Sequence, residues 1–339
     1  MVGADRWPKV APQAAPKAAP KAAIAAAMII AVTAASYYAP RCAAAEVAVG
    51  SSTTAIGCAK LTYPAPTDWY FPPSASRGLV WMQHGFVESK DVWSALAPQI
   101  ARRGYLVVAT TLPTIALFNC TVENLGDNTG FLKNIAEVFA TKDITTGALA
   151  SSYATAATKA GRPPVPLPDK LVFVGHSAGV EAVLYVAQRL NSTYPATFAQ
   201  MRGIVSEDGV KSFIGSNTDD ALAGLSGTAL LIYATASQSY LCNDFQSGTK
   251  AIEKYLATRP FLGVNVTTGV HGDALGPSSP FYENLVCNFP KPKNVDAVWQ
   301  LTGGWITDMF AGTTTADYYP GGPLDTSLQN ARIISTLPS

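Results

Sequence analysis

A run of apolar, β-forming residues in the middle of the chain leads directly into a glycine-flanked serine. Leu171 to Val174 are followed by Gly-His-Ser-Ala-Gly at 175–179, and residues 180–190 carry apolar side chains at helical spacing. A strand that turns sharply into a helix around a central serine needs glycine two positions to either side, because side chains there would collide. Gly-x-Ser-x-Gly also arises by chance, but this strand and helix are the context that the turn requires. The pattern predicts that Ser177 presents its hydroxyl at the carboxyl end of a buried parallel strand.

Strands and helices alternate along the rest of the chain. A strand at 78–83, a helix that ends before Gly104 and a strand at 105–110 predict a right-handed crossover in a parallel sheet. This alternation favours an α/β-hydrolase fold, with a mostly parallel central sheet and helices on both faces. We also expect edge strands within 46–77, helices at 131–139, 147–160, 249–258 and 295–310, and strands at 203–206, 229–234 and 261–267. The pair Gly303-Gly304 is a potential break in the last helix.

The general base can be found by elimination. A serine hydroxyl is a weak nucleophile near neutral pH, so Ser177 needs a base within hydrogen-bond reach and a third group that orients this base. The chain has three histidines. His176 lies in the turn and is expected to face away from the partner of Ser177, and His84 follows an early strand. His271 follows the last predicted strand, where a Ser, acid, His order places the base, so we assign it that role.

Two carboxylates compete for the role of the orienting acid. Asp208 lies at the end of the strand that follows the serine helix, whereas Asp244 lies well beyond the end of the next strand. A strand end fixes a carboxylate better than a distant loop does, so Asp208 is favoured and Asp244 is the alternative. Glu207 is expected on the opposite face of the strand, because neighbouring side chains alternate. Asp273 is expected to stabilise the loop that carries His271.

Two N–H groups must stabilise the oxyanion that forms when an ester is attacked. The serine turn supplies the Ala178 N–H, and the sequence His84-Gly85-Phe86 supplies the Phe86 N–H, with Gly85 allowing the backbone to approach closely. We expect Phe86 and His176 to border the substrate. Ordinary core packing is the alternative for Phe86.

Several blocks of the sequence are shared with known enzymes: residues 81–86, 93–109, 175–179, 207–210 and 270–273. They resemble chlorophyllases and the related cutinase-like hydrolases of polyesters. The resemblance implies an esterase. In chlorophyllases the acid follows the strand after the serine helix, which supports Asp208, whereas the polyester hydrolases carry their acid one strand later. The similar His-x-Asp after the last strand supports His271. Ala178 and Val180 differ from the residues that the two families place after the serine. The resemblance therefore implies ester chemistry and does not identify one substrate.

Residues 1–45 have the layout of an export signal. Four basic residues precede an uncharged, mostly alanine stretch at 22–39, and Ala43-Ala44-Ala45 follows. The stretch is less apolar than a membrane-spanning helix, so cleavage after Ala45 is favoured over a retained anchor, and a plastid-targeting peptide is a further alternative. We expect a secreted or periplasmic protein in which residues 46–339 form one catalytic domain.

Four cysteines remain once the leader is removed. An even number favours two disulfides in an oxidising compartment, although four cysteines allow three connectivities. We expect Cys58 to pair with Cys120 and Cys242 with Cys287, so that the second bond flanks the loop of His271. Four buried free thiols are the alternative.

Charge and composition limit the partners. With 24 Lys and Arg against 23 Asp and Glu, the net charge of +1 gives no electrostatic basis for binding nucleic acid or an anionic membrane surface. The sequence has no recognisable metal-ligand spacing or phosphate-binding loop, so we expect a monomer without cofactor or metal that acts on a small or polymeric ester. The leading hypothesis is a serine esterase. An acyltransferase of the same fold, a polyester- or cutin-degrading hydrolase and a non-catalytic binding protein are the alternatives.

Overall fold

A nine-stranded sheet forms the centre of the described chain. The computed structural model describes residues 46–115, 120–123, 128–141 and 147–338, so the expected leader lies outside the described residues. The strands lie in the order β1-β2-β4-β3-β5-β6-β7-β8-β9, and the six from β4 to β8 are parallel. Strands β1, β2 and β9 pair antiparallel with their neighbours. The strand bounds are β1 Ala48–Cys58, β2 Leu61–Phe71, β3 Leu79–Gln83, β4 Leu106–Thr110, β5 Leu171–His176, β6 Met201–Glu207, β7 Leu231–Ala236, β8 Gly263–Val266 and β9 Ile334–Leu337.

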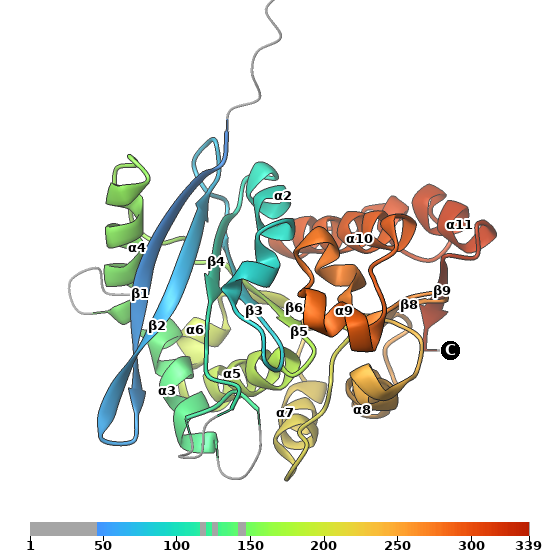
Figure 1. The fold of residues 1–339 in the computed structure, drawn as a ribbon, viewed down its shortest axis with the longest axis horizontal. Coiled ribbons are helices and arrows are strands. Elements are labelled where there is room, and N and C mark those ends of the chain that lie inside the picture. Colours follow the sequence, from blue (N-terminus) through green and yellow to red (C-terminus); the bar gives the residue numbers. More distant parts are fainter. Residues whose placement is uncertain (1–45, 116–119, 124–127, 142–146, 339) are drawn as a thin grey trace, which may run out of the picture. The chain divides into compact units, whose positions relative to one another are not determined.

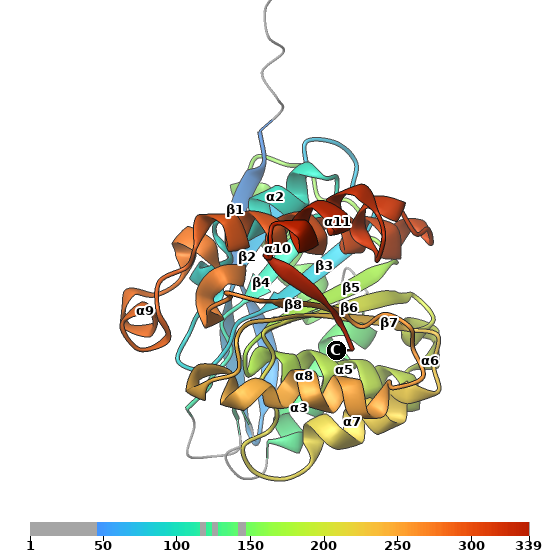
Figure 2. The same cartoon turned by 90° about the vertical axis from the view of Figure 1, so that its right-hand side faces the viewer.

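Helices cover both faces of this sheet (Figures 1 and 2). Helices α3, α4, α5, α7 and α8 pack on one face, and α2 and α10 pack on the other. Successive residues of a strand alternate between these two cores: Phe173 of β5 lies in the first, and Val172 and Val174 lie in the second. The helix bounds are α2 Leu96–Arg102, α3 Thr129–Ala140, α4 Ala148–Lys159, α5 Gly179–Thr193, α6 Pro195–Phe198, α7 Asn217–Ser226, α8 Ser247–Tyr255, α9 Phe281–Cys287, α10 Pro292–Ala311 and α11 Pro323–Asn330.

The expected short edge strands within 46–77 are one long hairpin. β1 and β2 pair over eleven residues each, and β2 continues the sheet by pairing with β4. Pro64 and Pro66 lie inside β2, although proline has no N–H to donate to a sheet. The carbonyl of Pro66 accepts the N–H of Thr111, on the side away from β1. The nitrogen of a strand residue points to the same side as its carbonyl, so the proline at 66 breaks no hydrogen bond between β1 and β2.

Helix α10 is continuous, so the break considered at Gly303-Gly304 is wrong. Both glycines lie where other side chains press against the helix. A Cβ on Gly303 would lie 2.5 Å from the guanidinium of Arg103, and one on Gly304 would lie 2.5 Å from the ring of Tyr318. These glycines therefore serve close packing and do not end the helix.

The helix expected before Gly104 is divided into two parts. A 3₁₀ turn spans Lys90–Trp93, and α2 begins at Leu96. The side chain of Ser89 accepts the N–H of Asp91 and so caps the turn. In the ranges that the structure describes, every helix is too short or too polar to cross a bilayer.

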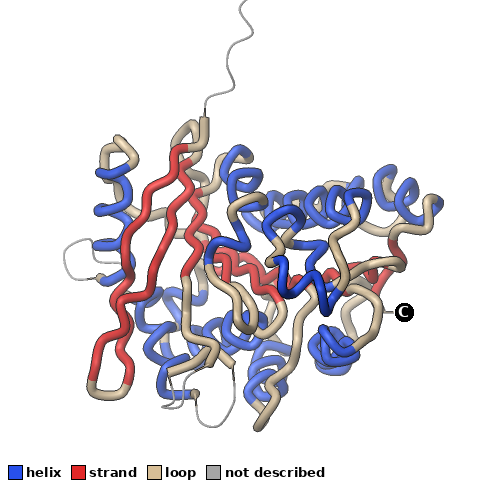
Figure 3. The backbone as a smooth tube through the Cα atoms, viewed as in Figure 1, coloured by secondary structure: helices blue, strands red, loops and turns tan. Residues whose placement is uncertain are grey.

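The carboxyl ends of the parallel strands place four distant loops at one edge of the sheet (Figure 3). The loop after β3 carries Phe86, and the turn after β5 carries Ser177. Asp208 follows β6 directly, and His271 follows β8. Ligand sites of open parallel sheets form at this edge, so the fold brings the predicted chemistry together.

Candidate active site

Ser177 occupies a sharp turn between β5 and α5. Its backbone φ is 51°, a left-handed conformation that is rare for a residue with a side chain. Its N–H donates to the carbonyl of Glu207 at 3.1 Å, which ties the turn to the end of β6. A Cβ on Gly175 would lie 2.8 Å from the Gly179 carbonyl oxygen, and one on Gly179 would lie 2.4 Å from the His84 carbonyl oxygen. The steric requirement for glycine at both positions is therefore confirmed.

His271 is held by Asp208, the carboxylate favoured from the sequence. The Nδ1 atom of His271 lies 2.6 Å from Oδ2 of Asp208, and both residues are buried. The other oxygen of Asp208 accepts the Ser237 N–H at 2.7 Å and the Asn243 amide at 3.2 Å, and the Ser237 hydroxyl donates to Oδ2 at 2.6 Å. Burial by itself raises the pKa of Asp208, but the hydrogen bonds from His271 and Ser237 outweigh it and lower that pKa below its usual value. Asp208 therefore stays ionised and fixes Nδ1 as the protonated nitrogen of His271.

The other carboxylates of the region have different surroundings. Asp244 lines the cavity beside Ser177, but within the described ranges no hydrogen bond or ion pair joins it to His271. Glu207 faces the opposite side of β6, as strand alternation predicts, and its oxygens accept hydrogen bonds from Thr235 and Thr302.

Asp273 stabilises its own loop, as expected. Its carboxylate accepts the N–H groups of Val270 and Lys291 and the side-chain amide of Asn294. Burial raises its pKa above the usual value, despite these bonds. The loop of His271 is thereby anchored to the start of α10.

A cavity of about 160 Å³ opens beside Ser177 and His271. Its wall combines the proposed nucleophile and base with aromatic, aliphatic and acidic side chains. A larger cavity of about 490 Å³ lies at the amino end of β4, away from this edge, and is lined mainly by proline and apolar residues. The smaller cavity is the candidate site because it contains the reactive groups. It is lined by Phe86, Glu88, Ser177, Ala178, Val210, Phe213, Leu241, Cys242, Asp244, His271, Glu283 and Cys287.

The loop after β3 lies directly against the serine. A Cβ on Gly85 would lie only 2.6 Å from Cβ of Ser177. Phe86 and Ala178 both line the cavity, and among the described residues no hydrogen bond uses either of their N–H groups. The role of these two N–H groups at an oxyanion stays a prediction, with which their position in the cavity wall agrees. The Phe86 ring is partly exposed and meets Phe213 edge-on, with ring centres 6.3 Å apart.

His84 fixes the conformation of the loop after β3 through hydrogen bonds to the backbone. Its Nε2 atom accepts the Leu112 N–H at 3.0 Å, and Nδ1 lies 2.8 Å from the Gly85 carbonyl, to which it donates. These two roles define one neutral tautomer, and burial lowers the pKa of His84. The elimination of His84 as the base agrees with this position.

His176 lies behind the cavity and not in its wall. The side chain is fully buried, with Nδ1 3.1 Å from Oε2 of Glu88 and Nε2 3.0 Å from the carbonyl oxygen of His271. Burial alone lowers the pKa of His176, but the charge of Glu88 and its hydrogen bond raise it to about 10. The expected substrate contact of His176 is thus replaced by a contact with the loop of the base.

Sequence reasoning missed two acids of the site, Glu88 and Glu283. Glu88 follows Phe86 by two positions and resembles any loop carboxylate in the sequence, and Glu283 lies on the short helix α9. Both line the cavity. Burial and the nearby charge of Glu88 raise the pKa of Glu283, whereas the charge of His176 outweighs burial and lowers the pKa of Glu88.

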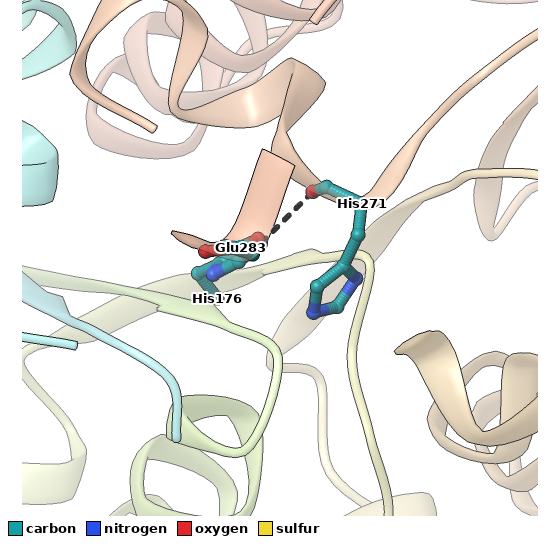
Figure 4. Close-up of side chains that lie close together, drawn as sticks. All are labelled: His176, His271 and Glu283. Carbon is teal, nitrogen blue, oxygen red and sulfur yellow. Dashed lines mark hydrogen bonds between the residues drawn. The ribbon is translucent and has the colours of Figure 1, made fainter. Parts of the chain in front are cut away.

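His176, His271 and Glu283 lie close enough together to suggest a metal site (Figure 4). One potential ligand atom from each lies within 4.8 Å of the other two. Both nitrogens of His176 already face acceptors, Glu88 and the carbonyl of His271. A metal bound by His176 would have to displace one of these hydrogen bonds, so the arrangement favours proton chemistry over metal binding.

Two disulfides form with the expected pairing. Cys58 bonds to Cys120 and Cys242 to Cys287, with Cα atoms 5.6 and 5.8 Å apart. The second bond joins the segment after β7 to the end of α9 in the cavity wall. Next to it, the Tyr240 hydroxyl accepts the His271 N–H at 2.9 Å and donates to the Cys287 carbonyl at 2.7 Å.

Comparison with known proteins identifies the architecture. No protein-family model matches the sequence, and no curated protein matches it. Brefeldin A esterase, described as a bacterial homologue of human hormone-sensitive lipase, is similar over 88% of this chain and 89% of its own, at 11% identity and a TM-score of 0.52. A fungal esterase from Rhizomucor miehei is similar over 88% of this chain and 99% of its own, at 14% identity and a TM-score of 0.51. The narrower resemblance to chlorophyllases and cutinase-like enzymes stays a prediction. The chain has the α/β-hydrolase fold.

Proposed function

We propose that this chain is a serine esterase that hydrolyses carboxylic esters through an acyl-enzyme on Ser177. The observation that carries the proposal is the 2.6 Å contact of Asp208 with His271, which lines the same cavity as Ser177. A nucleophile, a base and an acid that orients the base are the groups that acyl transfer requires. The similar solved structures with the α/β-hydrolase fold include esterases, which agrees with this reaction.

The reaction has two halves. Nε2 of His271 accepts the Ser177 hydroxyl proton while Oγ bonds to the ester carbon, and the oxyanion is stabilised by the N–H groups of Phe86 and Ala178. The C–O bond to the alcohol then breaks, and the alcohol leaves with the proton from His271. In the second half, His271 takes a proton from water, the hydroxide part adds to the acyl carbon, and Ser177 leaves with that proton. Asp208 stabilises the imidazolium in both halves.

The surroundings of the cavity favour an apolar ester. Large hydrophobic side chains are exposed on the loops after β3, β6 and β7 and on α9, next to the cavity wall. Exposed apolar patches of this kind mark binding surfaces. A polymeric or aggregated ester such as a polyester or cutin is therefore a specific candidate within the proposed class. The exposed residues are Phe86, Val87, Phe213, Ile214, Leu241, Phe245, Phe281, Tyr282, Leu285, Val286 and Phe289.

Hydrolysis of a panel of esters tests this proposal. The purified protein should release p-nitrophenol from acetate to decanoate esters. A porphyrin ester and an aromatic polyester in the same panel, followed by release of acid, test larger substrates. Ser177→Ala should lose this activity. Product analysis with an added alcohol separates hydrolysis from acyl transfer, because an acyltransferase would form a new ester in place of free acid. A wild-type protein without activity on any ester would contradict the proposal.

We also propose that the protein acts outside the cytoplasm, as a monomer. The two disulfides favour an oxidising compartment, and the basic, alanine-rich leader supports export. Protein isolated from the culture medium or periplasm should begin at Glu46, and its mass in solution should match one chain. Recovery of the full-length chain in the cytoplasm would contradict the proposed location.

A further inference from the structure

A buried ion pair lies behind the proposed nucleophile and has no part in the mechanism given above. Oε2 of Glu88 lies 3.1 Å from Nδ1 of His176, and their side chains are 2% and 0% exposed. Buried ion pairs contribute little net stability, because removing two charges from water costs about as much as their attraction returns. Stability therefore does not explain this ion pair, and the residues that it contacts indicate its role.

His176 acts as a double hydrogen-bond donor. Nδ1 faces the carboxylate of Glu88, and Nε2 faces the backbone carbonyl of His271 at 3.0 Å. Both partners are acceptors, so each ring nitrogen must carry a hydrogen, and the ring is an imidazolium. The raised pKa of His176 agrees with this geometry.

The pair connects two loops that carry groups of the proposed reaction. The carboxylate of Glu88 also accepts the N–H of Gly85, in the loop that presents the Phe86 N–H. The other donor of His176 fixes the carbonyl of His271. His176 is itself the residue before Ser177. One ion pair thus spans the oxyanion loop, the nucleophile and the base.

Other charged groups surround the pair. Glu283 of α9 faces the Glu88–His176 pair from the cavity side. Asp208 is hydrogen-bonded to the ring of His271, and His84 lies in the same loop as Glu88. Burial and the charge of Glu88 raise the pKa of Glu283, whereas the charge of His176 outweighs burial and lowers the pKa of Glu88. Glu88 is therefore the carboxylate that pairs with His176.

We propose that Glu88 and His176 form a positioning pair, which holds the oxyanion loop and His271 at a fixed separation across Ser177. This inference rests on the proposed esterase activity. The pair acts through the residues that it positions, and His176 itself does not contact the substrate. The pair prevents displacement of the catalytic groups in the transition state, where a displacement of about 1 Å costs roughly 100-fold in rate.

Conservative substitutions test the pair. Glu88→Gln keeps the size and an acceptor for Gly85 but removes the charge. His176→Asn retains a donor near the place of Nδ1, and His176→Gln retains one near that of Nε2. Each variant should lose roughly 10- to 100-fold in kcat on p-nitrophenyl butyrate, with KM within about threefold of wild type. Active sites are counted by fluorophosphonate labelling, so that kcat refers to folded enzyme only.

A double variant separates one pair from two independent residues. If Glu88 and His176 act as a unit, Glu88→Gln/His176→Gln should lose about as much kcat as the slower single variant. Asp68→Asn is the matched control. Asp68 is also buried and paired, with Lys90 at 2.7 Å, but it lies on β2 outside the site, so kcat should not change.

The protonation state of His176 can be measured in the wild-type protein, so this test does not depend on the folding of a variant. Nitrogen-15 spectra of labelled histidine should show His176 with both N–H hydrogens from pH 5 to about 9. A neutral His176 at pH 7, unchanged kcat in the single variants or multiplying losses in the double variant would each overturn the inference. Failure of the esterase proposal looks different, because Ser177→Ala would then retain activity or the wild type would have none.

Discussion

Asp208 and His271 are joined by a 2.6 Å hydrogen bond, although 63 positions separate them in the chain. Asp208 follows the end of β6, and His271 follows β8. This contact favours Asp208 over Asp244 as the acid of the proposed reaction.

Replacing the acid should separate Asp208 from Asp244. Asp208→Asn should lower kcat by about 10⁴-fold, because an amide in place of the carboxylate favours the wrong tautomer of the base. Asp244→Asn should leave kcat within about threefold of wild type, since among the described residues no hydrogen bond or ion pair joins its side chain to His271. Steady-state kinetics on p-nitrophenyl butyrate measure both. If Asp244→Asn shows the larger loss, the assignment of the acid is wrong.

A methyl group at Gly85 should slow the reaction. The added Cβ would lie 2.6 Å from Cβ of Ser177 and displace the loop of the Phe86 N–H, so kcat should fall by about 10² or more. Gly130→Ala is the matched control, because nothing lies within 4 Å of its added Cβ in helix α3. This control should keep full activity and gain about 0.5 to 1 kcal/mol in stability. Equal activity of the two variants would contradict the placement of the loop.

Glu207 should make stability depend on pH. Burial raises the pKa of this carboxyl from 4.5 to about 7, although Thr235 and Thr302 donate hydrogen bonds to it. Between these pH values the folded state holds a proton that the unfolded state releases, so stability falls as pH rises from about 4.5 to 7. Glu207→Gln should therefore be more stable than wild type by roughly 1 to 3 kcal/mol at pH 8 and equal to it at pH 4. Urea unfolding at both pH values measures the difference, and an equal gain at pH 4 would refute the assignment.

The two disulfides should contribute to different properties. Each closes a loop of 45 or 62 positions, so removing either with paired Cys→Ala changes should cost about 4 kcal/mol. Loss of Cys242–Cys287 should also lower kcat, because this bond holds α9 and the partner of Tyr240 next to His271. Loss of Cys58–Cys120 should lower only the melting temperature. Steady-state kinetics of the two variants, at a temperature where both are folded, test this difference. Equal kcat values of the two variants would contradict the separate roles of the disulfides.

The positions of the candidate reactive residues could be predicted because local patterns constrain them. The turn around Ser177 needs glycine at both flanks and a strand and helix around it, and each requirement is visible within a short stretch of sequence. The contact of His271 with Asp208 could be predicted because few histidines compete for it and because a strand end limits where a carboxylate can point. The alternation of apolar and mixed segments likewise predicts the parallel sheet.

Long-range surroundings could not be predicted in the same way. The partners of His176, Glu88 and the carbonyl of His271, come from two loops whose approach only the folded sheet determines. Helix α9 was missed because it spans only seven residues, too few for apolar side chains at helical spacing, such as Phe281 and Leu285, to mark a helix in sequence. The prolines of β2 concealed a long strand, because their tolerance depends on which neighbour each nitrogen faces.

Covalent labelling of the serine tests the central claim most directly. The wild-type protein, treated with a fluorophosphonate and measured by intact mass and peptide mapping, should gain one phosphonyl group on Ser177 and lose its esterase activity in parallel. Ser177→Ala should take up no label and hydrolyse no ester. An active wild-type protein that stays unlabelled, or a Ser177→Ala variant that retains full activity, would contradict the account.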